Sequence, residues 1–236
     1  MRPPPDELSY AEAFRGHEAA LHDLLARTGA RRVLEIGGGR RPLLAPARIA
    51  AHGLDYTVLD ISPAELAAAP PGYRTVVGDI ADPGLTVPVA DVDLAFSRFL
   101  AEHVGSGESF HRNVRRLLRP GGVAFHFFPT LWHPVFVANR LMPEALARRV
   151  FYALFPREYP KFPARYSWCR GPTPRMRAML ARVGLEIVEF RTFYGTYYLR
   201  RIPLGGVLDE ALAGWAARRR SPYLCSYAYL VVRRPV

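Results

Sequence analysis

The stretch VLEIGGGRRPLLAP, residues 33–46, decides the fold. Its first four residues are apolar except for Glu35, and three glycines follow at once. An apolar run that ends in glycines is typical of a β-strand that turns into a ligand-binding loop, because glycine lets a ligand approach the backbone closely. Residues 40–42, Arg-Arg-Pro, stand where a phosphate-binding loop would carry a further glycine or a lysine. The loop therefore lacks a strong phosphate cradle.

Apolar and helical segments alternate on both sides of this loop. The patterns predict strands at 31–37, 55–62, 73–80, 91–99, 123–129, 185–195 and 226–234. They predict helices at 6–28, 107–122, 143–155, 173–184 and 208–220. Strands that alternate with helices at this spacing indicate βαβ units and a parallel sheet. The uncharged stretch 120–139 reads as a buried strand followed by an aromatic loop, and residues 129–172 contain helical patches between turns rich in proline and aromatic residues.

An acidic residue lies at or near the end of each of the first three strands: Glu35, Asp60 and Asp79. In an open parallel sheet, ligands bind beyond the carboxyl ends of the strands. Asp60 follows the glycine loop at the interval from which a carboxylate accepts hydrogen bonds from ribose hydroxyls. Asp79 could accept from an adenine amino group. Together the motifs predict a nucleoside site.

These motifs resemble the class I S-adenosylmethionine-dependent methyltransferases over most of residues 30–128. VLEIGGG is similar to the family's first motif, VLDIS to its ribose-binding acid, VVGDI to its adenine-contacting acid, DLAFSRFLAEHV to its fourth strand and RLLRPGG to the turn before its fifth. The resemblance implies an α/β, Rossmann-like fold with helices on both faces of a seven-stranded sheet whose last strand is antiparallel. It implies S-adenosyl-L-methionine as the cofactor.

The resemblance also implies a set of cofactor-binding residues. Glu35 and the backbone of Gly37, Gly38 and Gly39 would hold the methionyl end, Asp60 with Ile61 the ribose, Asp79 with Ile80 the adenine, and the Ser97 carbonyl the amino group. A leading helix often closes over the cofactor in this family, so Tyr10 and Phe14, which share a helix face, are lid candidates beside a plain packing role. The family often carries a further glycine where Arg41 stands, and we expect both loop arginines to point outward.

Methyl transfer is an in-line displacement that depends on alignment of the acceptor with the donor methyl. A hydroxyl or amine acceptor must also lose a proton, for which a neutral histidine is suited, whereas a carboxylate needs no base. The candidate bases are His103, His133 and His126. Each has a plainer alternative: His103 bonded to Glu102 or to backbone, His126 a core residue, and His133 an exposed loop residue.

Two segments, 129–172 and 195–222, are expected to form a helical and aromatic substrate insertion. Their aromatic side chains could line a pocket for a planar or apolar acceptor, or form the underside of a lid or a homodimer contact. Interleaved arginines could clamp a carboxylate or phosphate, or lie on the surface. The aromatic residues are Trp132, Phe136, Tyr152, Phe155, Tyr159, Phe162, Tyr166, Trp168, Tyr197 and Tyr198, and the arginines are Arg140, Arg165, Arg170 and Arg200.

The expected function is methyl transfer to a small molecule, aromatic or carboxylate-bearing and possibly anionic, in secondary metabolism. The alternatives are another reaction of the cofactor, such as cyclisation, lyase chemistry or decarboxylation, and an RNA methyltransferase. The net charge of +11 suggests nucleic acid, yet 31 of the 32 basic residues are arginines spread along the chain, and SRFL replaces the N-P-P-[YF] motif of nucleic-acid enzymes.

The 236 residues suit one domain, residues 1–236, with a lid helix at 6–28 and a cofactor-binding core at 30–128. Two cysteines suffice for neither a metal site nor a disulfide framework. The first ten residues lack the apolar run of a signal peptide, and prolines and histidines interrupt the one long uncharged stretch, 120–139. We therefore expect a cytoplasmic protein without a transmembrane segment or bound metal.

Overall fold

Seven strands form one sheet in the order β3-β2-β1-β4-β5-β7-β6. The computed structural model describes residues 5–155, 163–167 and 169–236. Strands β1 to β5 are parallel, and β7 is antiparallel to both of its neighbours. The expected seven-stranded sheet with an antiparallel last strand is confirmed. The strands are β1 (Arg32–Ile36), β2 (Asp55–Asp60), β3 (Arg74–Val77), β4 (Val92–Arg98), β5 (Leu118–Pro129), β6 (Glu186–Phe193) and β7 (Tyr227–Arg233).

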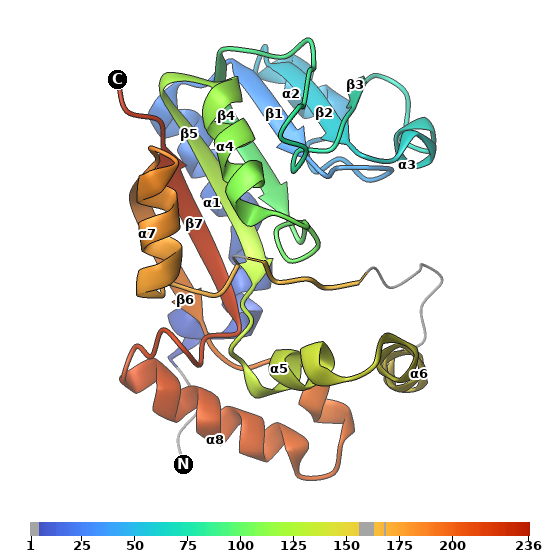
Figure 1. The fold of residues 1–236 in the computed structure, drawn as a ribbon, viewed down its shortest axis with the longest axis vertical. Helices are drawn as coiled ribbons and strands as arrows, with labels where there is room; N and C mark the ends of the chain where they lie inside the picture. The colour runs from blue at the N-terminus through green and yellow to red at the C-terminus, as the bar shows by residue number, and fades with distance from the viewer. Residues whose placement is uncertain (1–4, 156–162, 168) are drawn as a thin grey trace.

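Helices cover both faces of the sheet. In Figure 1, α1 lies behind the sheet, α4 and α7 lie in front of it, and α5, α6 and α8 lie below it, toward the carboxyl end of β5. The helices are α1 (Tyr10–Thr28), α2 (Pro46–Ala51), α3 (Pro63–Ala67), α4 (Gly107–Leu117), α5 (Pro134–Leu141), α6 (Glu144–Leu154), α7 (Pro174–Arg182) and α8 (Gly205–Arg218), with short 3-10 helices η1 (Asp6–Leu8) and η2 (Tyr198–Arg201).

Capping residues set several helix ends where the sequence predicts them. The Thr173 hydroxyl accepts a hydrogen bond from the Met176 N–H at the start of α7. Gly29 ends α1 with a φ of 60°, a left-handed conformation that glycine adopts without strain. The first helix begins later than predicted, because Ser9 caps α1 and only η1 precedes it.

One predicted boundary lies close to the observed one, and one predicted loop differs from the structure. Helix α4 ends at Leu117 and β5 begins at Leu118, shortly before Pro120 and the two glycines, where the sequence predicts that the helix stops. Pro120 explains this end, because its ring favours extended backbone in the preceding residue and it has no N–H for a helical hydrogen bond. The expected aromatic loop contains α5, which begins with Pro134 at its first position.

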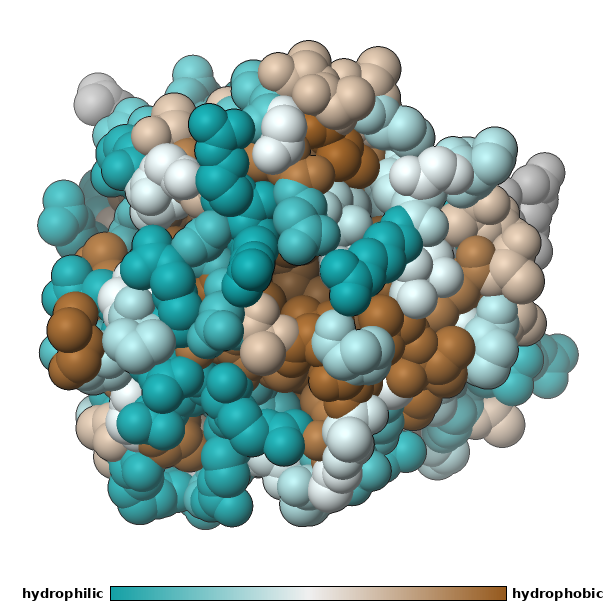
Figure 2. Space-filling model, turned by 90° about the horizontal axis from the view of Figure 1, so that it is seen from above, coloured by the Kyte–Doolittle hydropathy of each residue, from teal (hydrophilic) through white to brown (hydrophobic). Residues whose placement is uncertain are grey.

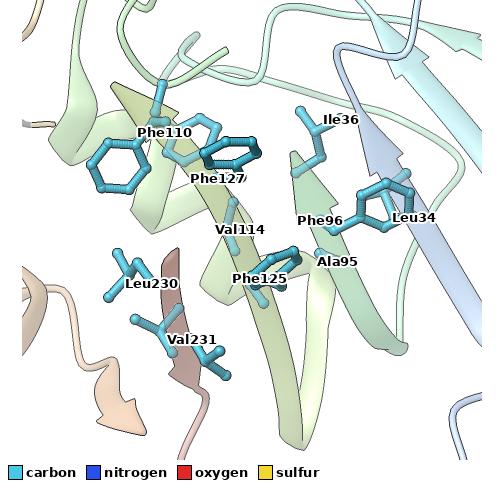
Figure 3. Close-up of a cluster of buried hydrophobic side chains, with 14 of the residues drawn as sticks. Leu34, Ile36, Ala95, Phe96, Phe110, Val114, Phe125, Phe127, Leu230 and Val231 are labelled. Carbon is cyan, nitrogen blue, oxygen red and sulfur yellow. The ribbon is translucent and has the colours of Figure 1, made fainter. Parts of the chain in front are cut away.

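The core lies between the sheet and α4 on one side and α1 on the other. Figure 3 shows Phe110 of α4 and Phe127 of β5, both buried. Phe110 packs against His126 of β5 on one face of the sheet, and Phe127 packs against Phe14 of α1 on the other. A 530 Å³ cavity, described below, lies beyond this core at the carboxyl end of β5. The core thus fixes β4 and β5, whose last residues reach the cavity.

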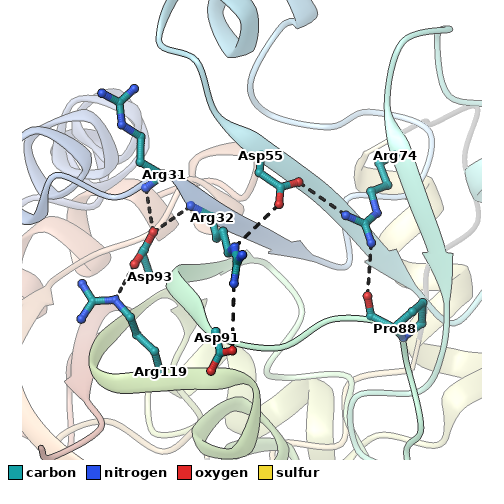
Figure 4. A network of polar contacts seen from close by, with 8 residues as sticks. All are labelled: Arg31, Arg32, Asp55, Arg74, Pro88, Asp91, Asp93 and Arg119. Carbon is teal, nitrogen blue, oxygen red and sulfur yellow. Dashed lines mark hydrogen bonds and ion pairs between the residues drawn. The ribbon is translucent and has the colours of Figure 1, made fainter.

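Arginines and aspartates join the amino ends of the strands (Figure 4). One Asp93 oxygen accepts hydrogen bonds from the backbone N–H groups of Arg31 and Arg32, both at 2.8 Å, and the other accepts from the Arg119 side chain. Asp55 lies 3.5 Å from the Arg74 guanidinium. This edge of the sheet is opposite the strand ends where a ligand would bind. Some of the arginines that give the chain its positive charge therefore stabilise the fold instead of binding a ligand.

The surface carries hydrophilic and hydrophobic residues side by side. Figure 2, seen from above Figure 1, shows hydrophilic residues spread across that face with hydrophobic ones between them. Within the described residues, every helix is too short or too polar to span a lipid bilayer.

Candidate active site

The glycine loop after β1 is packed too closely for side chains. A Cβ atom on Gly37, whose φ is +77°, would lie 2.9 Å from the Leu100 side chain. A Cβ atom on Gly38 would lie 2.8 Å from the side chains of Glu35 and Val58. The loop therefore folds down onto the ends of β1 and β2, and its backbone lines the edge of the sheet where a ligand is expected.

Glu35 lies beneath this loop. Its carboxylate is buried and accepts hydrogen bonds from the Leu43 N–H, at 3.0 Å, and from the Tyr56 hydroxyl. Burial raises the pKa of Glu35, while these two hydrogen bonds lower it. The carboxylate joins both ends of the loop to β2, so it holds the loop's shape. Direct contact between Glu35 and a cofactor stays a prediction.

Asp60 lies at the end of β2, close to the loop. Its carboxylate accepts a hydrogen bond from the Ser62 N–H at 2.9 Å and also faces the backbone N–H of Gly39, and burial raises its pKa. A Cβ atom on Gly39 would lie 3.3 Å from an Asp60 oxygen. The neighbouring Ile61 side chain is 64% exposed. An acid beside an exposed apolar side chain suits a ribose and the flat base attached to it.

Arg40, the first arginine of the loop, forms an ion pair. The Arg40 guanidinium donates two hydrogen bonds to Glu65 of α3, at 2.6 and 2.5 Å. Hydrogen bonding from Arg40 holds the pKa of Glu65 below its usual range. Arg41 is exposed, and its backbone N–H donates to the Gly38 carbonyl at 3.0 Å. Both arginines thus take part in closing the loop.

Asp79 and Ile80 follow β3. The Asp79 carboxylate accepts a hydrogen bond from the Ala81 N–H at 2.8 Å and stays exposed. The Ile80 side chain is buried, and its carbonyl accepts from the Asn113 amide at 2.9 Å. Any contact between Ile80 and an adenine would therefore involve its backbone. Asn113 of α4 fixes this turn.

Ser97 and His126 lie side by side on β4 and β5. The Ser97 hydroxyl and His126 Nδ1 are 2.8 Å apart, and both side chains are fully buried. The His126 ring packs against Phe110 and His111 of α4, and burial lowers its pKa well below the usual value. This placement favours the core alternative for His126. The Ser97 carbonyl belongs to the backbone, so burial of the side chain does not prevent this carbonyl from binding the amino group of the cofactor, which stays a prediction.

Arg98, the last residue of β4, is a charged group that sequence reasoning missed. It is half-buried, and its charge lowers the pKa of both Glu35 and His17. Across the described parts of the chain, no hydrogen bond or ion pair holds its guanidinium. The sequence feature that could have identified Arg98 as a site residue is its position directly after Ser97, at the end of the predicted fourth strand.

A cavity of about 530 Å³ lies beyond the carboxyl ends of β4 and β5. Its wall combines α1, α5, α6 and η2, so residues far apart in the sequence meet there. Of the two lid candidates, Phe14 lines the cavity, and Tyr10 lies 6.5 Å from the Tyr197 ring beside it. Among the described residues, nine aromatic side chains line the cavity: Phe14, Phe99, Phe136, Phe151, Phe155, Tyr166, Tyr197, Tyr198 and Tyr227.

Glu102 and His103 are the acid–base groups of this wall. His103 Nδ1 lies 2.9 Å from the Pro163 carbonyl, which can only accept, so Nδ1 carries the proton. His103 Nε2 lies 3.6 Å from Glu102 Oε1. Burial raises the pKa of Glu102 to about 8, and its Oε2 atom has no hydrogen-bond partner within the described part of the chain. Such a carboxyl group is neutral near pH 7 and can exchange a proton there.

His133 is placed differently from the expected loop position. It is buried before α5, with Nε2 3.1 Å from Oδ1 of the buried Asp209 on α8. Asp209 also accepts a hydrogen bond from the Thr196 N–H at 2.7 Å. Of the three candidate histidines, only His103 borders the described cavity. The other two hold elements together.

The arginines expected to clamp an anion lie outside the cavity wall. Arg200 pairs with Glu210 at 3.5 Å, and Arg170 donates to the Tyr166 carbonyl at 3.3 Å. Arg140 and Arg165 are also absent from the cavity lining that the described residues form. Among the aromatic candidates, Tyr159, Phe162 and Trp168 lie outside the described residues.

The segment that carries the glycine loop and the acids is similar to known proteins. Residues 34–126 match the methyltransferase domain family. A protein of Mycobacteroides abscessus described as an uncharacterized methyltransferase is 35% identical over 112 residues, which are 43% of this chain and 40% of the relative. One from Mycobacterium avium is 33% identical over 51% of this chain and 50% of its own length. The chain therefore spans about half or less of the curated relatives it matches.

Solved structures share the fold. An S-adenosylmethionine-dependent methyltransferase from Mesorhizobium loti has a TM-score of 0.57 and 21% identity, over 92% of this chain and 96% of that one. A geranyl diphosphate C-methyltransferase from Streptomyces coelicolor A3(2) has a TM-score of 0.54 and 14% identity, over 93% and 78%. The [4+2]-cyclase SpnF has a TM-score of 0.54 and 16% identity, over 100% and 87%.

Proposed function

Because residues 34–126 form a methyltransferase domain of the class I S-adenosylmethionine-dependent family, we propose that the protein methylates a small molecule with a largely apolar body. The observation that carries this proposal is the aromatic cavity of about 530 Å³ with one neutral carboxyl group in its wall, at the carboxyl ends of β4 and β5. A cavity of this size and lining suits a drug-sized ligand.

The residues around the glycine loop fit S-adenosyl-L-methionine. The crowded glycines offer backbone instead of side chains, and Asp60 with Ile61 offers an acceptor next to an apolar surface. The Arg98 guanidinium lies at the same edge, where it would bind the carboxylate of the methionyl group. When bound, the cofactor supplies an electrophilic methyl group on a sulfonium.

The chain's own part in the reaction is to orient the acceptor and to remove its proton. The aromatic wall excludes water and positions the acceptor's apolar body. Glu102 in its ionised form, or His103 through Nε2, would take a proton from a hydroxyl or amine of the acceptor. A neutral acceptor is favoured over an anionic one, because the described cavity wall contains no arginine that could pair with a negative charge.

Calorimetry tests the cofactor first. Folded protein should bind S-adenosyl-L-methionine and the demethylated product, S-adenosyl-L-homocysteine, and failure to bind either would refute the proposal. The second step incubates the protein with cofactor labelled in the methyl group and a panel of apolar alcohols, phenols and amines. A labelled acceptor supports methyl transfer. Cofactor breakdown or a rearranged acceptor without methylation would instead assign one of the other cofactor reactions.

A further inference from the structure

Exposed aliphatic side chains surround the mouth of the cavity. Val150 of α6 and Ile202, which follows η2, line the cavity and are also 40% and 42% exposed, so they mark where it opens. Leu146 lies one helical turn before Val150 and is exposed as well. The opening is therefore framed by aliphatic side chains that face water.

The same end of the molecule carries further exposed aliphatic residues. Leu204, Val207 and Leu208 lie at the start of α8, directly after η2, and each is more than two-thirds exposed. Figure 1 shows α5, α6 and the start of α8 together at the lower end of the molecule. We call the set the mouth patch. It comprises Leu141, Leu146, Val150, Ile202, Leu204, Val207 and Leu208.

Arginines border the mouth patch. Arg148 and Arg149 are exposed on α6, within one turn of Leu146 and Val150. Arg140 of α5 and Arg200 and Arg201 of η2 are exposed as well. The exposed acids in these segments are Glu144 and Glu210, and Arg200 already pairs with Glu210. The border is therefore positively charged overall.

We propose that the mouth patch docks on an anionic lipid bilayer. Aliphatic side chains that enter the boundary between headgroups and acyl chains, with arginines at the level of the phosphates, are how peripheral proteins bind membranes. Charge complementarity favours this occupant, because five arginines around the patch meet the negative surface of an anionic leaflet. Exposed large apolar side chains gathered at one end of a protein, around the mouth of a cavity, signal an interaction site.

Docking would place the cavity mouth against the acyl chains, so an apolar substrate could pass into the cavity from the bilayer without crossing water. This consequence for the substrate rests on the proposed function, whereas docking itself does not. Vesicle binding is measured without cofactor. A protein that binds vesicles and fails to bind S-adenosyl-L-methionine would therefore keep the docking proposal and lose the proposed function.

The test is sedimentation of the protein with sucrose-loaded vesicles. Vesicles of phosphatidylcholine with phosphatidylserine should carry the protein to the pellet, and vesicles of phosphatidylcholine alone should carry much less. The double variant Val207→Glu/Leu208→Glu should partition about tenfold less, because it places acids where aliphatic groups enter the bilayer. Arg148→Glu/Arg149→Glu should also partition less, and added salt should weaken binding of the natural chain.

Matched controls lie away from the patch. Val188→Glu changes another exposed valine, in β6, and Arg27→Glu changes an exposed arginine of α1, so both should bind like the natural chain. Equal pelleting with both kinds of vesicle, no pelleting, or the same loss in the controls would overturn the proposal. A concentration-dependent dimer that the Val207→Glu/Leu208→Glu variant abolishes, without vesicle binding, would assign the patch to a second copy instead.

Discussion

His103 Nε2 lies 3.6 Å from Glu102 Oε1, at the wall of the aromatic cavity. The two groups are consecutive in the sequence, yet they differ in surroundings, because Glu102 is wholly buried and His103 is 31% exposed. The Pro163 carbonyl holds the proton on His103 Nδ1, so Nε2 is the basic atom. The pair places a carboxyl group and the basic nitrogen of an imidazole beside one ligand cavity.

Glu102→Gln should lower kcat about 100-fold while affinity for the cofactor stays unchanged. With Glu102 as the base, only its ionised form accepts a proton, so the natural enzyme's rate should rise as pH increases toward about 8, the pKa of Glu102. The variant should lose this rise. Measurement of kcat across the neutral and alkaline range, on both sides of the pKa of Glu102, tests this. The control is Glu108→Gln, which changes a carboxylate that pairs with Arg112 outside the cavity. An unchanged pH profile in Glu102→Gln would remove Glu102 from the reaction.

The same residue should make stability depend on pH. Burial raises the pKa of Glu102 from 4.5 to about 8, so its contribution is fully favourable below pH 4.5 and is lost as pH rises toward about 8. The natural chain should therefore lose more unfolding free energy than Glu102→Gln over this interval, by on the order of 3 kcal/mol. Urea unfolding at both ends of the interval measures the difference. Parallel curves for the two proteins would mean that Glu102 is ionised in the folded state.

Asp60→Asn should weaken cofactor binding about tenfold, or about 1.4 kcal/mol, because an amide replaces one carboxylate acceptor next to the loop. Calorimetry with S-adenosyl-L-homocysteine checks this. Asp82→Asn is the control, since Asp82 accepts a backbone hydrogen bond in a similar turn farther along the chain. Equal affinities for the Asp60 variant and the natural chain would place the ribose elsewhere.

The two loop arginines should differ in effect. Arg40→Ala removes the ion pair with Glu65 that joins the loop to α3, so cofactor affinity should fall by roughly threefold, a value within the range for partly exposed pairs. Arg41→Gly should leave affinity nearly unchanged, because the Arg41 side chain is exposed and is expected to point away from the ligand. A tenfold loss in Arg41→Gly, with Arg40→Ala unaffected, would reverse their assignment.

Asp93→Ala should destabilise the fold by about 2 kcal/mol near neutral pH, because two backbone N–H groups and Arg119 lose their acceptor. Burial raises the pKa of Asp93, but its hydrogen bonds with Arg119, Arg32 and Arg31 outweigh this and lower it below 3.8. The gap between variant and natural chain should therefore shrink as pH falls through the pKa of folded Asp93. Denaturant unfolding measures it. The control is Asp23→Ala, which breaks an exposed ion pair with Arg27 and should change the free energy of unfolding little. A stability difference between Asp93→Ala and the natural chain that persists in acid would contradict the ionic explanation.

Local sequence was enough to predict the sheet and the edge where a ligand would bind. The glycines after β1 and the acids after β2 and β3 are local signals, since each lies where its own strand ends. Pro120 predicted that α4 would stop nearby, but it did not predict that β5 already begins at Leu118, which pairs with Val92. That pairing joins residues 26 positions apart, so the residues next to Leu118 carry no signal of it.

The sequence by itself determined which strands are followed by the glycine loop and the acids, and it predicts a nucleoside site at the carboxyl ends of those strands. Only the tertiary structure decided which charged groups face a ligand. It turned His126 into the core, paired His133 with Asp209, and brought Glu102 to a cavity wall built from α1, α5, α6 and η2. The physical reason is that a side chain's burial, and with it its pKa and reactivity, depends on distant segments that pack against it.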